Sequence, residues 1–588
     1  MFRVFSQLGW FFKEERKRYT IAISLLILVG IFDIVPPRLV GLAIDDMYLG
    51  TMTSDRLVMY IAILMGVTVT SYTLTYHWMY KLFGGGYLVE RKLRSRLMAH
   101  LLRMSPPFYE KNRTGDLMAR ATNDVKAVSI TAGFGVLTLI DASAFMLTVV
   151  VTMVILIDWK LTLAAMLPLP IMAYIIKLLG SKIHTRFMEA QSSFGQLNDR
   201  VLESVAGVRV LRAYVQERAD ETRFQEMTED VYGKNMNVAR IDALFDPVIK
   251  ILVGMSYLIG LGYGSYLVFQ QDITLGDLVT FNVYLGMMIW PMFAIGELIN
   301  IMQRGNASLD RLNETFNYNP DVVDKKDAES AKKPDPNEFK AYSFTYPSND
   351  QPGLHNLDFS LQKGQTLGVV GKTGSGKTTL VKQWLRYYPV GGGSWTIGGK
   401  DVADQPVDTV RAWTGYVPQD HILFSKSVRE NIAYGKDEVS DEELDKAIQL
   451  AALDQDLPFL QDGLETLVGE KGVALSGGQK QRISIARAFV LDPDMLILDD
   501  SLSAVDAKTE ARIIENIRSE RKGKTTIITA HRLSAVQHAD VILVLDDGHI
   551  VEKGTHDELM ARGGWYATQY VHQQATSSYL QEVEKDEE

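Results

Sequence analysis

Six long apolar runs in the first half of the sequence place the strongest constraint on what this chain can fold into. Each run is close to or above the ~20 residues that a helix needs to cross the hydrocarbon core of a bilayer, and few of its residues are charged. One such run would fit a buried helix of a globular protein, but six of them predict a membrane domain. The runs span residues 21–40, 57–83, 136–157, 161–179, 248–269 and 278–301.

The connections between these runs alternate in length. Segments 44–56, 158–160 and 270–277 are short, whereas 84–135 and 180–247 are long and helix-rich in pattern, and the first of the long segments is rich in Lys and Arg. Positive charge marks the cytoplasmic side of a membrane protein. We therefore expect the long segments and both termini in the cytoplasm, with helices that continue well beyond the bilayer.

Some ionisable residues fall within the predicted spans, among them Asp33, His77, Asp141 and Glu297. A charged group in lipid is unfavourable and usually faces a bundle interior or water. Contact with a cationic substrate would explain them, but a hydrogen bond between helices, or a place near the interface for Glu297, explains each one more simply. Aromatic residues of the spans either line an apolar cavity or face lipid. The candidate cavity residues are Tyr72, Tyr76, Asp141, Phe145, Tyr284, Trp290 and Glu297.

Length and composition limit the number of domains and exclude several kinds of site. A chain of 588 residues is too long for one core, so several domains are expected. The absence of cysteine excludes disulfides, thiolate metal sites and a cysteine nucleophile, and the net charge of −10 gives no case for nucleic-acid binding. We predict a membrane domain over residues 1–317, a polar linker over 318–338, a globular domain over 339–575 and an acidic, flexible tail over 576–588.

A glycine-rich stretch in the second half, residues 371–378 with the sequence GKTGSGKT, fits the phosphate-loop pattern at every fixed position. The run 366–370 before it predicts a buried strand, and a helix-like segment follows. The glycines let backbone N–H groups turn toward phosphate oxygens, and a helix N-terminus favours negative charge. Lys377 is expected to reach the β- and γ-phosphates of ATP, and the Thr378 hydroxyl to bind Mg²⁺. The nucleotide-binding candidates of this stretch are Gly371, Thr373, Gly374, Ser375, Gly376, Lys377, Thr378 and Thr379.

A second apolar stretch ends in two carboxylates. Residues 495–500 read MLILDD, which predicts a buried parallel strand that presents Asp499 at its carboxyl end, where ligands bind in α/β sheets. Asp499 is the candidate ligand for Mg²⁺, and Asp500 is placed to polarise an attacking water. An exposed strand end is the simpler alternative, and the phosphate loop upstream argues against it.

Residues 475–479 read LSGGQ and lie between these two motifs. Together with the phosphate loop, this stretch is identified as the signature of ATP-binding cassette (ABC) proteins. The resemblance covers nearly the whole chain, because segments 113–125 and 207–214 look like the two intracellular coupling regions of type I ABC exporters. It implies an α-helical transmembrane domain of six spans with long cytoplasmic extensions, fused to an α/β phosphate-loop ABC domain, as in bacterial multidrug half-transporters.

The resemblance also implies roles for single residues. Tyr346 resembles the aromatic residue that stacks on adenine, Gln419 the residue that senses Mg²⁺ and the membrane domain, and His531 the switch histidine that contacts the γ-phosphate. Ser503 and Asp506 resemble a loop that crosses a dimer interface, and segment 468–472 resembles a stretch found in exporters. The signature would complete the ATP site of a second half-transporter chain through Leu475, Ser476, Gly477, Gly478 and Gln479.

Asp500 departs from the family pattern, in which the catalytic residue at this position is glutamate. Aspartate keeps the charge but is one methylene shorter, and a ~1 Å misplacement of a general base can lower a rate about a hundredfold. Lys377 and His531, the other candidate catalytic residues, match the pattern. The sequence therefore favours a heterodimer in which this chain's own site binds ATP and hydrolyses it slowly. A homodimer in which aspartate suffices is the alternative.

The predicted function is ATP-driven export of amphipathic drugs or other hydrophobic compounds across a bacterial cell membrane, with ATP and Mg²⁺ as cofactors. The fused spans argue against a soluble ABC ATPase. The sequence shows no added regulatory domain that would indicate an ATP-gated channel. A lipid flippase is the second candidate. A basic cluster in the cavity, which could bind lipid headgroups, would indicate a flippase. The candidate cavity residues are instead mostly acidic and aromatic, which favours cationic amphiphiles.

Overall fold

The computed structural model describes residues 2–469 and 475–575, and the chain divides into two units. The first unit comprises Met1–Leu102 and Thr114–Tyr318, and the second comprises Arg103–Arg113 together with the chain from Asn319 onward. The short segment 103–113 therefore belongs to the second unit, although it lies between two spans in the sequence. The predicted tail, 576–588, falls outside the described residues.

Within the described residues, the first unit contains six helices that are long and apolar enough to cross a membrane, which confirms the six predicted spans. They are 33 to 53 residues long, well above the ~20 residues that a bilayer requires, so each extends beyond the hydrocarbon core. The helices are Arg16–Tyr48, Ser54–Leu101, Thr114–Leu156, Trp159–Ala206, Glu217–Phe269 and Leu275–Asn317.

Prolines and changes of helix type divide several spans. The first span breaks between α3 and α4, just before Pro36-Pro37, and the sixth breaks between α16 and α17, just before Pro291, because proline removes a backbone donor and clashes with the preceding turn. The third span contains two π-helical segments, η1 (Arg120–Asp124) and η2 (Asp141–Phe145). The α-helices of the first unit are α1 (Arg3–Gln7), α2 (Gly9–Glu14), α3 (Arg16–Phe32), α4 (Val35–Tyr48), α5 (Ser54–Leu101), α7 (Thr114–Ala119), α8 (Val125–Ala132), α9 (Phe134–Ile140), α10 (Met146–Leu156), α11 (Trp159–Met166), α12 (Pro168–Ala206), α13 (Val208–Ala213), α14 (Glu217–Asp242), α15 (Phe245–Phe269), α16 (Leu275–Met287) and α17 (Ile289–Asn317).

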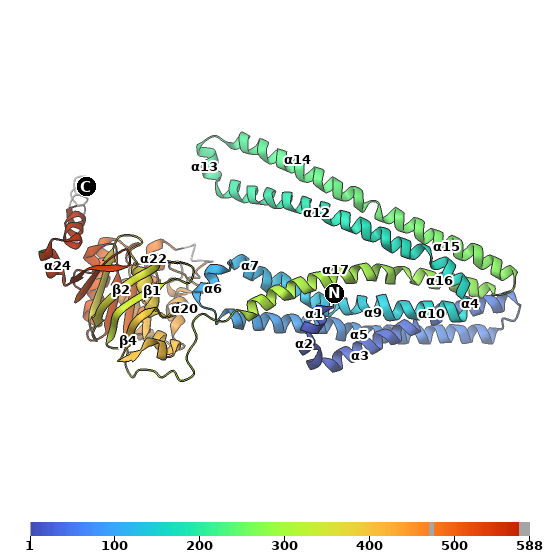
Figure 1. Ribbon diagram of the computed structural model, residues 1–588, viewed down its shortest axis with the longest axis horizontal. Coiled ribbons are helices and arrows are strands. Elements are labelled where there is room, and N and C mark those ends of the chain that lie inside the picture. Colours follow the sequence, from blue (N-terminus) through green and yellow to red (C-terminus); the bar gives the residue numbers. More distant parts are fainter. Residues whose placement is uncertain (1, 470–474, 576–588) are drawn as a thin grey trace. The chain divides into compact units, whose positions relative to one another are not determined.

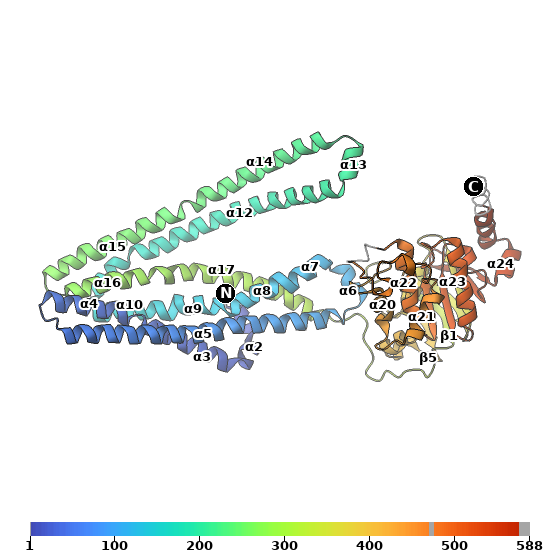
Figure 2. The same ribbon diagram turned by 180° about the vertical axis from the view of Figure 1, so that it is seen from behind.

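Two of these helices form a long hairpin. Figures 1 and 2 show α12 and α14 side by side, joined at one end by the short helix α13. The predicted second coupling segment, 207–214, forms that tip. The remaining spans pack into two apolar clusters, one around α3, α5, α8 and α17 and one around α10, α11, α15 and α16.

The second unit is built on two sheets. A six-stranded sheet has the order β10-β9-β3-β8-β7-β6, with all neighbours parallel except β9 and β10, and a four-stranded antiparallel sheet has the order β2-β1-β4-β5. The strands are β1 (Asn337–Thr345), β2 (Pro352–Leu361), β3 (Thr366–Gly371), β4 (Gly392–Ile397), β5 (Lys400–Asp401), β6 (Thr414–Val417), β7 (Met495–Asp499), β8 (Thr525–Thr529), β9 (Val541–Asp546) and β10 (His549–Gly554).

The apolar runs predicted as buried strands are β3 and β7, and every residue of β7 and β8 is buried. Such continuous apolar runs are typical of parallel strands that are covered on both faces. The α-helices of this unit are α6 (Pro106–Lys111), α18 (Lys377–Trp384), α19 (Val407–Ala412), α20 (Val428–Ile432), α21 (Asp441–Leu450), α22 (Gly477–Phe489), α23 (Ala507–Glu520) and α24 (His556–Arg562). The fold is therefore an α-helical membrane unit fused to an α/β unit, as predicted.

The segment predicted as a linker packs against the second unit. The backbone N–H of Val407 donates to Asp324 at 2.8 Å, and the N–H of Ala331 donates to Gln405 at 3.1 Å. Ser105, just before α6, donates from its hydroxyl to Asp321 at 3.0 Å. These bonds hold residues from 319 to the start of β1 on the α/β unit.

Candidate functional site

The phosphate loop connects the end of β3 to the start of α18, at the centre of the six-stranded sheet. Gly371 has φ 149° and Gly376 has φ 100°, conformations that favour glycine. A Cβ on Gly371 would lie 2.1 Å from the carbonyl oxygen of Leu545 on the neighbouring strand β9. The loop therefore needs glycine for both its conformation and its close packing, and it leads directly into the N-terminus of α18.

Lys377 is buried within this loop. Its Nζ donates to the carbonyl oxygens of Gly371 and Lys372, both at 2.9 Å. Burial lowers the pKa of Lys377, and the carboxylates of Asp500 and Asp499 oppose that shift. The ammonium is thus held at the loop by weak carbonyl acceptors and nearby carboxylates, where an anionic phosphate would be a much stronger partner.

Asp499 lies at the carboxyl end of β7, as predicted, and strand order brings it to the phosphate loop. Because β8 lies between β3 and β7, Thr529 at the end of β8 donates its hydroxyl to Asp499 at 2.8 Å. Thr378 donates to the same Oδ1 at 3.1 Å, and Tyr416 lies 3.5 Å from Oδ2. Burial raises the pKa of Asp499, and the two threonine hydrogen bonds oppose the rise.

These residues fit MgATP on three observations. The Ser375 hydroxyl is buried in the loop without a hydrogen-bond partner among the described residues, so it can donate to a phosphate oxygen. Lys377 supplies a buried cation. The Thr378 hydroxyl and the Asp499 carboxylate, 3.1 Å apart, form a pair of hard oxygen ligands of the kind that Mg²⁺ prefers.

Asp500 follows β7 in the left-handed region, with φ 46°. Its backbone N–H donates to the Thr529 hydroxyl at 2.9 Å, and its carbonyl accepts from the Ser503 hydroxyl at 3.0 Å. Aspartate is among the few residues that tolerate this backbone conformation, whereas longer side chains are disfavoured there. Thr529 therefore contacts both Asp499 and Asp500, a role that sequence reasoning did not assign because it depends on the strand order.

The other residues predicted to contact nucleotide lie around this centre. The Tyr346 hydroxyl, just after β1, donates to Thr379 at 2.9 Å, which ties its ring to α18. Gln419 is exposed and follows β6, the strand that neighbours β7. His531 is also exposed and follows β8 by two residues. Thr373 and Gly374 are exposed on the phosphate loop, so its outer rim is accessible.

The signature stretch forms the start of α22. Ser476 is the N-cap: its hydroxyl accepts from the backbone N–H of Gln479 at 3.3 Å, and the Gln479 side chain accepts from the Ser476 N–H at 3.0 Å. Ser476 and Gln479 therefore form a capping box at the start of α22. Leu475 is buried beneath it, whereas Ser476 and Gly477 are exposed and Gly478 is half-buried. Residues 470–472 of the predicted exporter segment lie outside the described residues.

Asp506, predicted in a loop that crosses a dimer interface, caps α23. Its carboxylate accepts from the backbone N–H groups of Lys508 and Thr509 at 3.0 and 2.9 Å and from the Thr509 hydroxyl at 2.7 Å. These hydrogen bonds lower the pKa of Asp506. The residue therefore has a structural role in its own chain.

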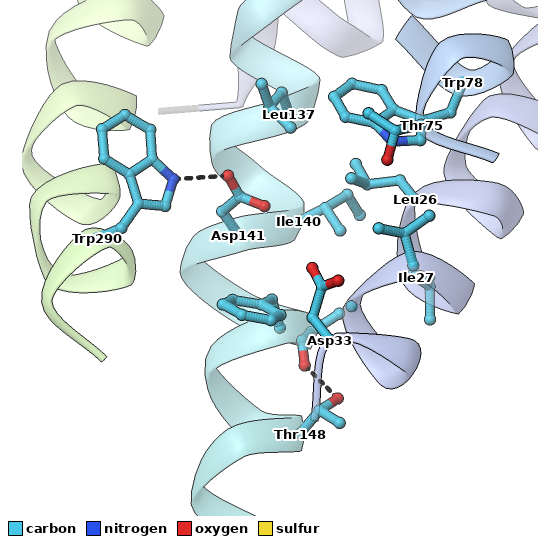
Figure 3. Close-up of a pocket in the computed structure, with 14 residues that line it drawn as sticks. Leu26, Ile27, Asp33, Thr75, Trp78, Leu137, Ile140, Asp141, Thr148 and Trp290 are labelled. Carbon is cyan, nitrogen blue, oxygen red and sulfur yellow. Dashed lines mark hydrogen bonds between the residues drawn. The ribbon is translucent and has the colours of Figure 1, made fainter. Parts of the chain in front are cut away.

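A cavity of about 410 Å³ opens among the helices of the first unit. Figure 3 shows that α3, η2, α5 and α17 contribute its walls, with the carboxylates of Asp33 and Asp141 both on the cavity. Trp290 donates from Nε1 to Asp141 at 2.8 Å. Asp33 has no hydrogen-bond or ion-pair partner within residues 2–469 and 475–575. Phe145 lies against Gly30, where a Cβ would come within 3.0 Å of the ring.

Only part of the predicted cavity set lines this space. Asp141, Phe145 and Trp290 do, and Asp141 also makes the helix–helix hydrogen bond that was the simpler alternative. Tyr284 is fully buried elsewhere, donating its hydroxyl to the Ile34 carbonyl at 2.8 Å. Tyr72 and Tyr76 are 74% and 68% exposed on α5, away from the cavity. Glu297 pairs with Arg304 at 3.5 Å on α17.

Two cavity residues were not among the predicted cavity set. They are Asp33, an ionisable residue of the first span, and Trp78 on α5. Both lie on the cavity wall, and the buried Nε1 of Trp78 has no hydrogen-bond partner in the described part of the chain. Neither position follows from the periodicity of a single helix, because the wall is made by packing several spans together.

Comparison with known sequences gives two family matches. The family model of the ABC transporter transmembrane region matches residues 19–292, and the family model described as ABC transporter matches residues 354–503. The chain is similar to the probable multidrug resistance ABC transporter ATP-binding/permease protein YheI of Bacillus subtilis, with 62% identity over 98% of each chain. It is also 42% identical to the multidrug resistance-like ATP-binding protein MdlA of Escherichia coli, over 100% of this chain and 99% of that one.

Two further matches extend the comparison. The ATP-dependent lipid A-core flippase of Syntrophus aciditrophicus is 33% identical over 96% of this chain and 93% of its own length. A solved bacterial Atm1-family ABC exporter with ATP bound has a TM-score of 0.77 and 27% identity, covering 95% of this chain and 98% of that one. The chain therefore belongs to the ABC transporter family, as a membrane-embedded exporter in which a transmembrane region is fused to an ATP-binding domain that couples ATP hydrolysis to transport.

Proposed function

We propose that this chain is one half of a heterodimeric exporter that uses ATP to move amphipathic, cationic compounds out of the cell. The observation that carries the substrate class is the cavity of the first unit, which combines apolar and aromatic walls with the carboxylates of Asp33 and Asp141. An intramembrane carboxylate without a protein cation beside it is unfavourable unless it meets water or a positively charged ligand.

The cavity also offers a match for a polar group on such a ligand. Trp78 is 7% exposed, and its Nε1 is a buried donor without a partner in the described residues. Its indole and that of Trp290 line the cavity, and the face of an indole ring attracts a cation. A volume of about 410 Å³ lies in the range of small-molecule sites. We infer a ligand with an apolar body, at least one cationic group and a hydrogen-bond acceptor.

ATP is proposed to bind at the phosphate loop of this chain, with adenine on Tyr346 and phosphates on Gly371 and residues 373–379. Bound Mg²⁺ would neutralise charge on the transferring phosphoryl group. In this chain, Thr378 and Asp499 would supply its protein oxygens, with Gln419 at the carboxyl end of the neighbouring strand. Lys377 stabilises negative charge on the γ-phosphate, and His531 is proposed to contact it from the end of β8.

Hydrolysis at this site is proposed to be slow because Asp500 stands where the family has glutamate. The shorter carboxylate follows a backbone in the left-handed region, at φ 46°, and the peptide around it is held by Thr529 and Ser503. Little backbone movement is then available to bring the carboxylate closer to the attacking water. Geometry limits a general base before its pKa does.

A partner chain follows from the same reasoning. In the family, each ATP lies between the phosphate loop of one chain and the signature of the other. Ser476 and Gly477 are exposed at the start of α22, where N–H groups and the helix dipole favour a phosphate. We propose that they complete a competent site whose phosphate loop and glutamate belong to a different half-transporter. A homodimer, with aspartate as a working base, is the alternative.

The proposed location is the bacterial cell membrane, with both termini and the ATP-binding domain in the cytoplasm. The basic residues of segment 84–135 support this orientation. Coupling to the ATP-binding domain is proposed to run through segments 108–116 and 208–216. ATP binding favours the outward-facing state, and hydrolysis at the competent site resets the cycle.

The substrate class is tested by dye transport into inverted membrane vesicles that contain the native complex. For an amphipathic cation, we expect Asp33→Asn and Asp141→Asn each to raise the half-saturating concentration about tenfold, equivalent to ~1.4 kcal/mol. For a neutral dye of similar size, the half-saturating concentration should change less than twofold. The control is Thr148→Val, which alters a polar cavity residue without changing charge.

An equal loss for both dyes would mean that the carboxylates support the fold rather than bind the cation, and the substrate proposal would fail. Movement of a fluorescent phospholipid at a rate above that of the dyes would identify a lipid flippase instead.

A further inference from the structure

One contact in the second unit joins α6 to the aromatic residues that lie beside α18. Tyr388 donates its hydroxyl to the carboxylate of Glu110. Glu110 belongs to a six-residue helix that lies, in the sequence, between the second and third spans, 278 residues away from Tyr388. The bond therefore ties a segment inserted between two membrane helices to the ATP-binding fold.

Tyr388 is well placed to respond to nucleotide. Its ring is 1% exposed and meets the ring of Tyr346 edge to face, with centroids 4.9 Å apart and an interplanar angle of 89°. Tyr346 is held in turn by its hydroxyl bond to Thr379 on α18 and by the ring of Phe344 at 5.0 Å. Lys382 Nζ lies 5.9 Å from the centroid of each tyrosine ring.

The protonation of Tyr388 suits a donor role. Burial raises the pKa of its hydroxyl, and the hydrogen bond to Glu110 raises the pKa further. The hydroxyl is therefore protonated at physiological pH and donates to the carboxylate. A hydrogen bond between a hydroxyl and a charged acceptor is shorter and stronger than one between neutral groups.

We propose that Tyr388 is a positioning residue that links occupancy of the adenine site to the helix α6. A base that stacks on Tyr346 fixes that ring, Tyr346 fixes the edge-to-face ring of Tyr388, and the Tyr388 hydroxyl holds Glu110 and with it α6. Pro107 and Phe108 of α6 are buried, and residues 103–113 belong to the same compact unit as the α/β fold. The inference rests on the proposed adenine contact of Tyr346 and adds a path by which that contact reaches the segment between the spans.

The test is hydrogen exchange of the peptide 103–113 in the full-length chain in lipid nanodiscs, with and without MgATP. We expect ATP to slow exchange of this peptide in the wild type. Tyr388→Phe, which keeps the ring and removes the hydroxyl, should lose at least half of that change while its ATP affinity stays within twofold of wild type. Tyr387→Phe is the matched control, because the neighbouring hydroxyl makes no hydrogen bond within the described residues, and it should keep the full change.

Variants at the acceptor separate a hydrogen bond from a packing role. Glu110→Gln keeps an acceptor oxygen and should keep most of the ATP-dependent change, whereas Glu110→Ala should match Tyr388→Phe. The double variant should lose no more than either single one. The proposal is overturned if Tyr388→Phe keeps the full change, if ATP bound to the wild type leaves the peptide unaffected, or if Tyr388→Phe lowers ATP affinity more than fivefold.

Tyr346→Ala distinguishes failure of this inference from failure of the ATP-site proposal. We expect this variant to bind ATP at least fivefold more weakly and to lose the change at 103–113. Unchanged affinity would reject the adenine contact and, with it, the path through Tyr346. If the variant binds ATP more weakly but shows the full change in exchange of peptide 103–113 at saturating ATP, the adenine contact would be supported and only the path through Tyr346 would be rejected.

Discussion

The carboxylates of the two units have opposite surroundings. Asp499 in the α/β unit is 1% exposed and accepts hydrogen bonds from Thr378 and Thr529. In the membrane unit, Asp141 accepts one hydrogen bond, from Trp290, and Asp33 has no partner in the described part of the chain. A site for phosphate chemistry gains from fixed geometry, whereas a site for varied ligands gains from groups left available to them. The difference suggests that the α/β unit holds its carboxylate in a fixed geometry, whereas the membrane unit leaves its carboxylates available to ligands of different shape.

The largest expected effect concerns Lys377. Lys377→Ala removes a buried cation whose hydrogen-bond acceptors among the described residues are only carbonyl oxygens. A hydrogen bond to a charged group contributes ~1.5–3 kcal/mol. ATP affinity of the full chain in nanodiscs should therefore fall about 10- to 100-fold, as measured by titration with a fluorescent ATP analogue. Lys372→Ala is the control, because that side chain is 64% exposed and lies 3.8 Å from Asp546. Similar losses in both variants would contradict a fixed site.

A smaller effect is expected at the signature. Ser476→Ala removes the N-cap of α22 and should lower the free energy of unfolding by ~1 kcal/mol. It should also lower ATP hydrolysis by the native complex severalfold, because the same hydroxyl is proposed to meet the partner's nucleotide. Ser440→Ala removes the equivalent N-cap of α21. Ser440→Ala should lower the free energy of unfolding by the same amount and leave the rate of ATP hydrolysis within twofold of wild type. Equal rates of hydrolysis in the two variants would mean that Ser476 acts only as a structural cap.

The smallest effect is expected in the cavity. Trp290→Phe keeps an aromatic ring and removes the donor to Asp141, and hydrogen bonds between membrane helices contribute ~0.6 kcal/mol on average. Cationic dye affinity should change about threefold or less, measured by equilibrium binding in nanodiscs. Trp159→Phe, on an indole that is 57% exposed outside the cavity, should have no effect. A loss above tenfold at Trp290 would show that the cavity is as rigid as the ATP site, which would end the comparison.

The parts that the sequence predicted well are those carried by local pattern. The six spans follow from runs of apolar residues. The strand before the phosphate loop and the strand that ends at Asp499 follow from short motifs, because each depends on neighbours within a few residues.

The parts that the sequence missed depend on contacts between distant segments. Thr529 reaches Asp499 only because β8 lies between β3 and β7. Asp33 and Trp78 lie on the cavity only because several spans pack together. The periodicity of one helix does not show which other helix each of its faces contacts. Likewise, helix α6 joins the α/β unit through Tyr388, although the two are far apart in the sequence.

The central claim is that Asp500 makes this chain's own ATP site a poor catalyst. The most direct measurement is steady-state MgATP hydrolysis by the purified chain alone in nanodiscs, beside Asp500→Glu and Asp500→Asn, with ATP binding and thermal stability recorded for each. Glutamate is disfavoured in the left-handed region by ~1 kcal/mol, so a small loss of stability is expected in the first variant.

We predict that the wild-type chain binds ATP but hydrolyses it far more slowly than ~1 s⁻¹, and that Asp500→Asn behaves in the same way. If the chain self-associates, Asp500→Glu should hydrolyse at a transporter-like rate; if all three stay silent while binding ATP, an obligate partner is required, as the heterodimer implies. Hydrolysis by the wild-type chain at ~1 s⁻¹ or faster, lost in Asp500→Asn, would contradict the account and leave a homodimer with a working aspartate.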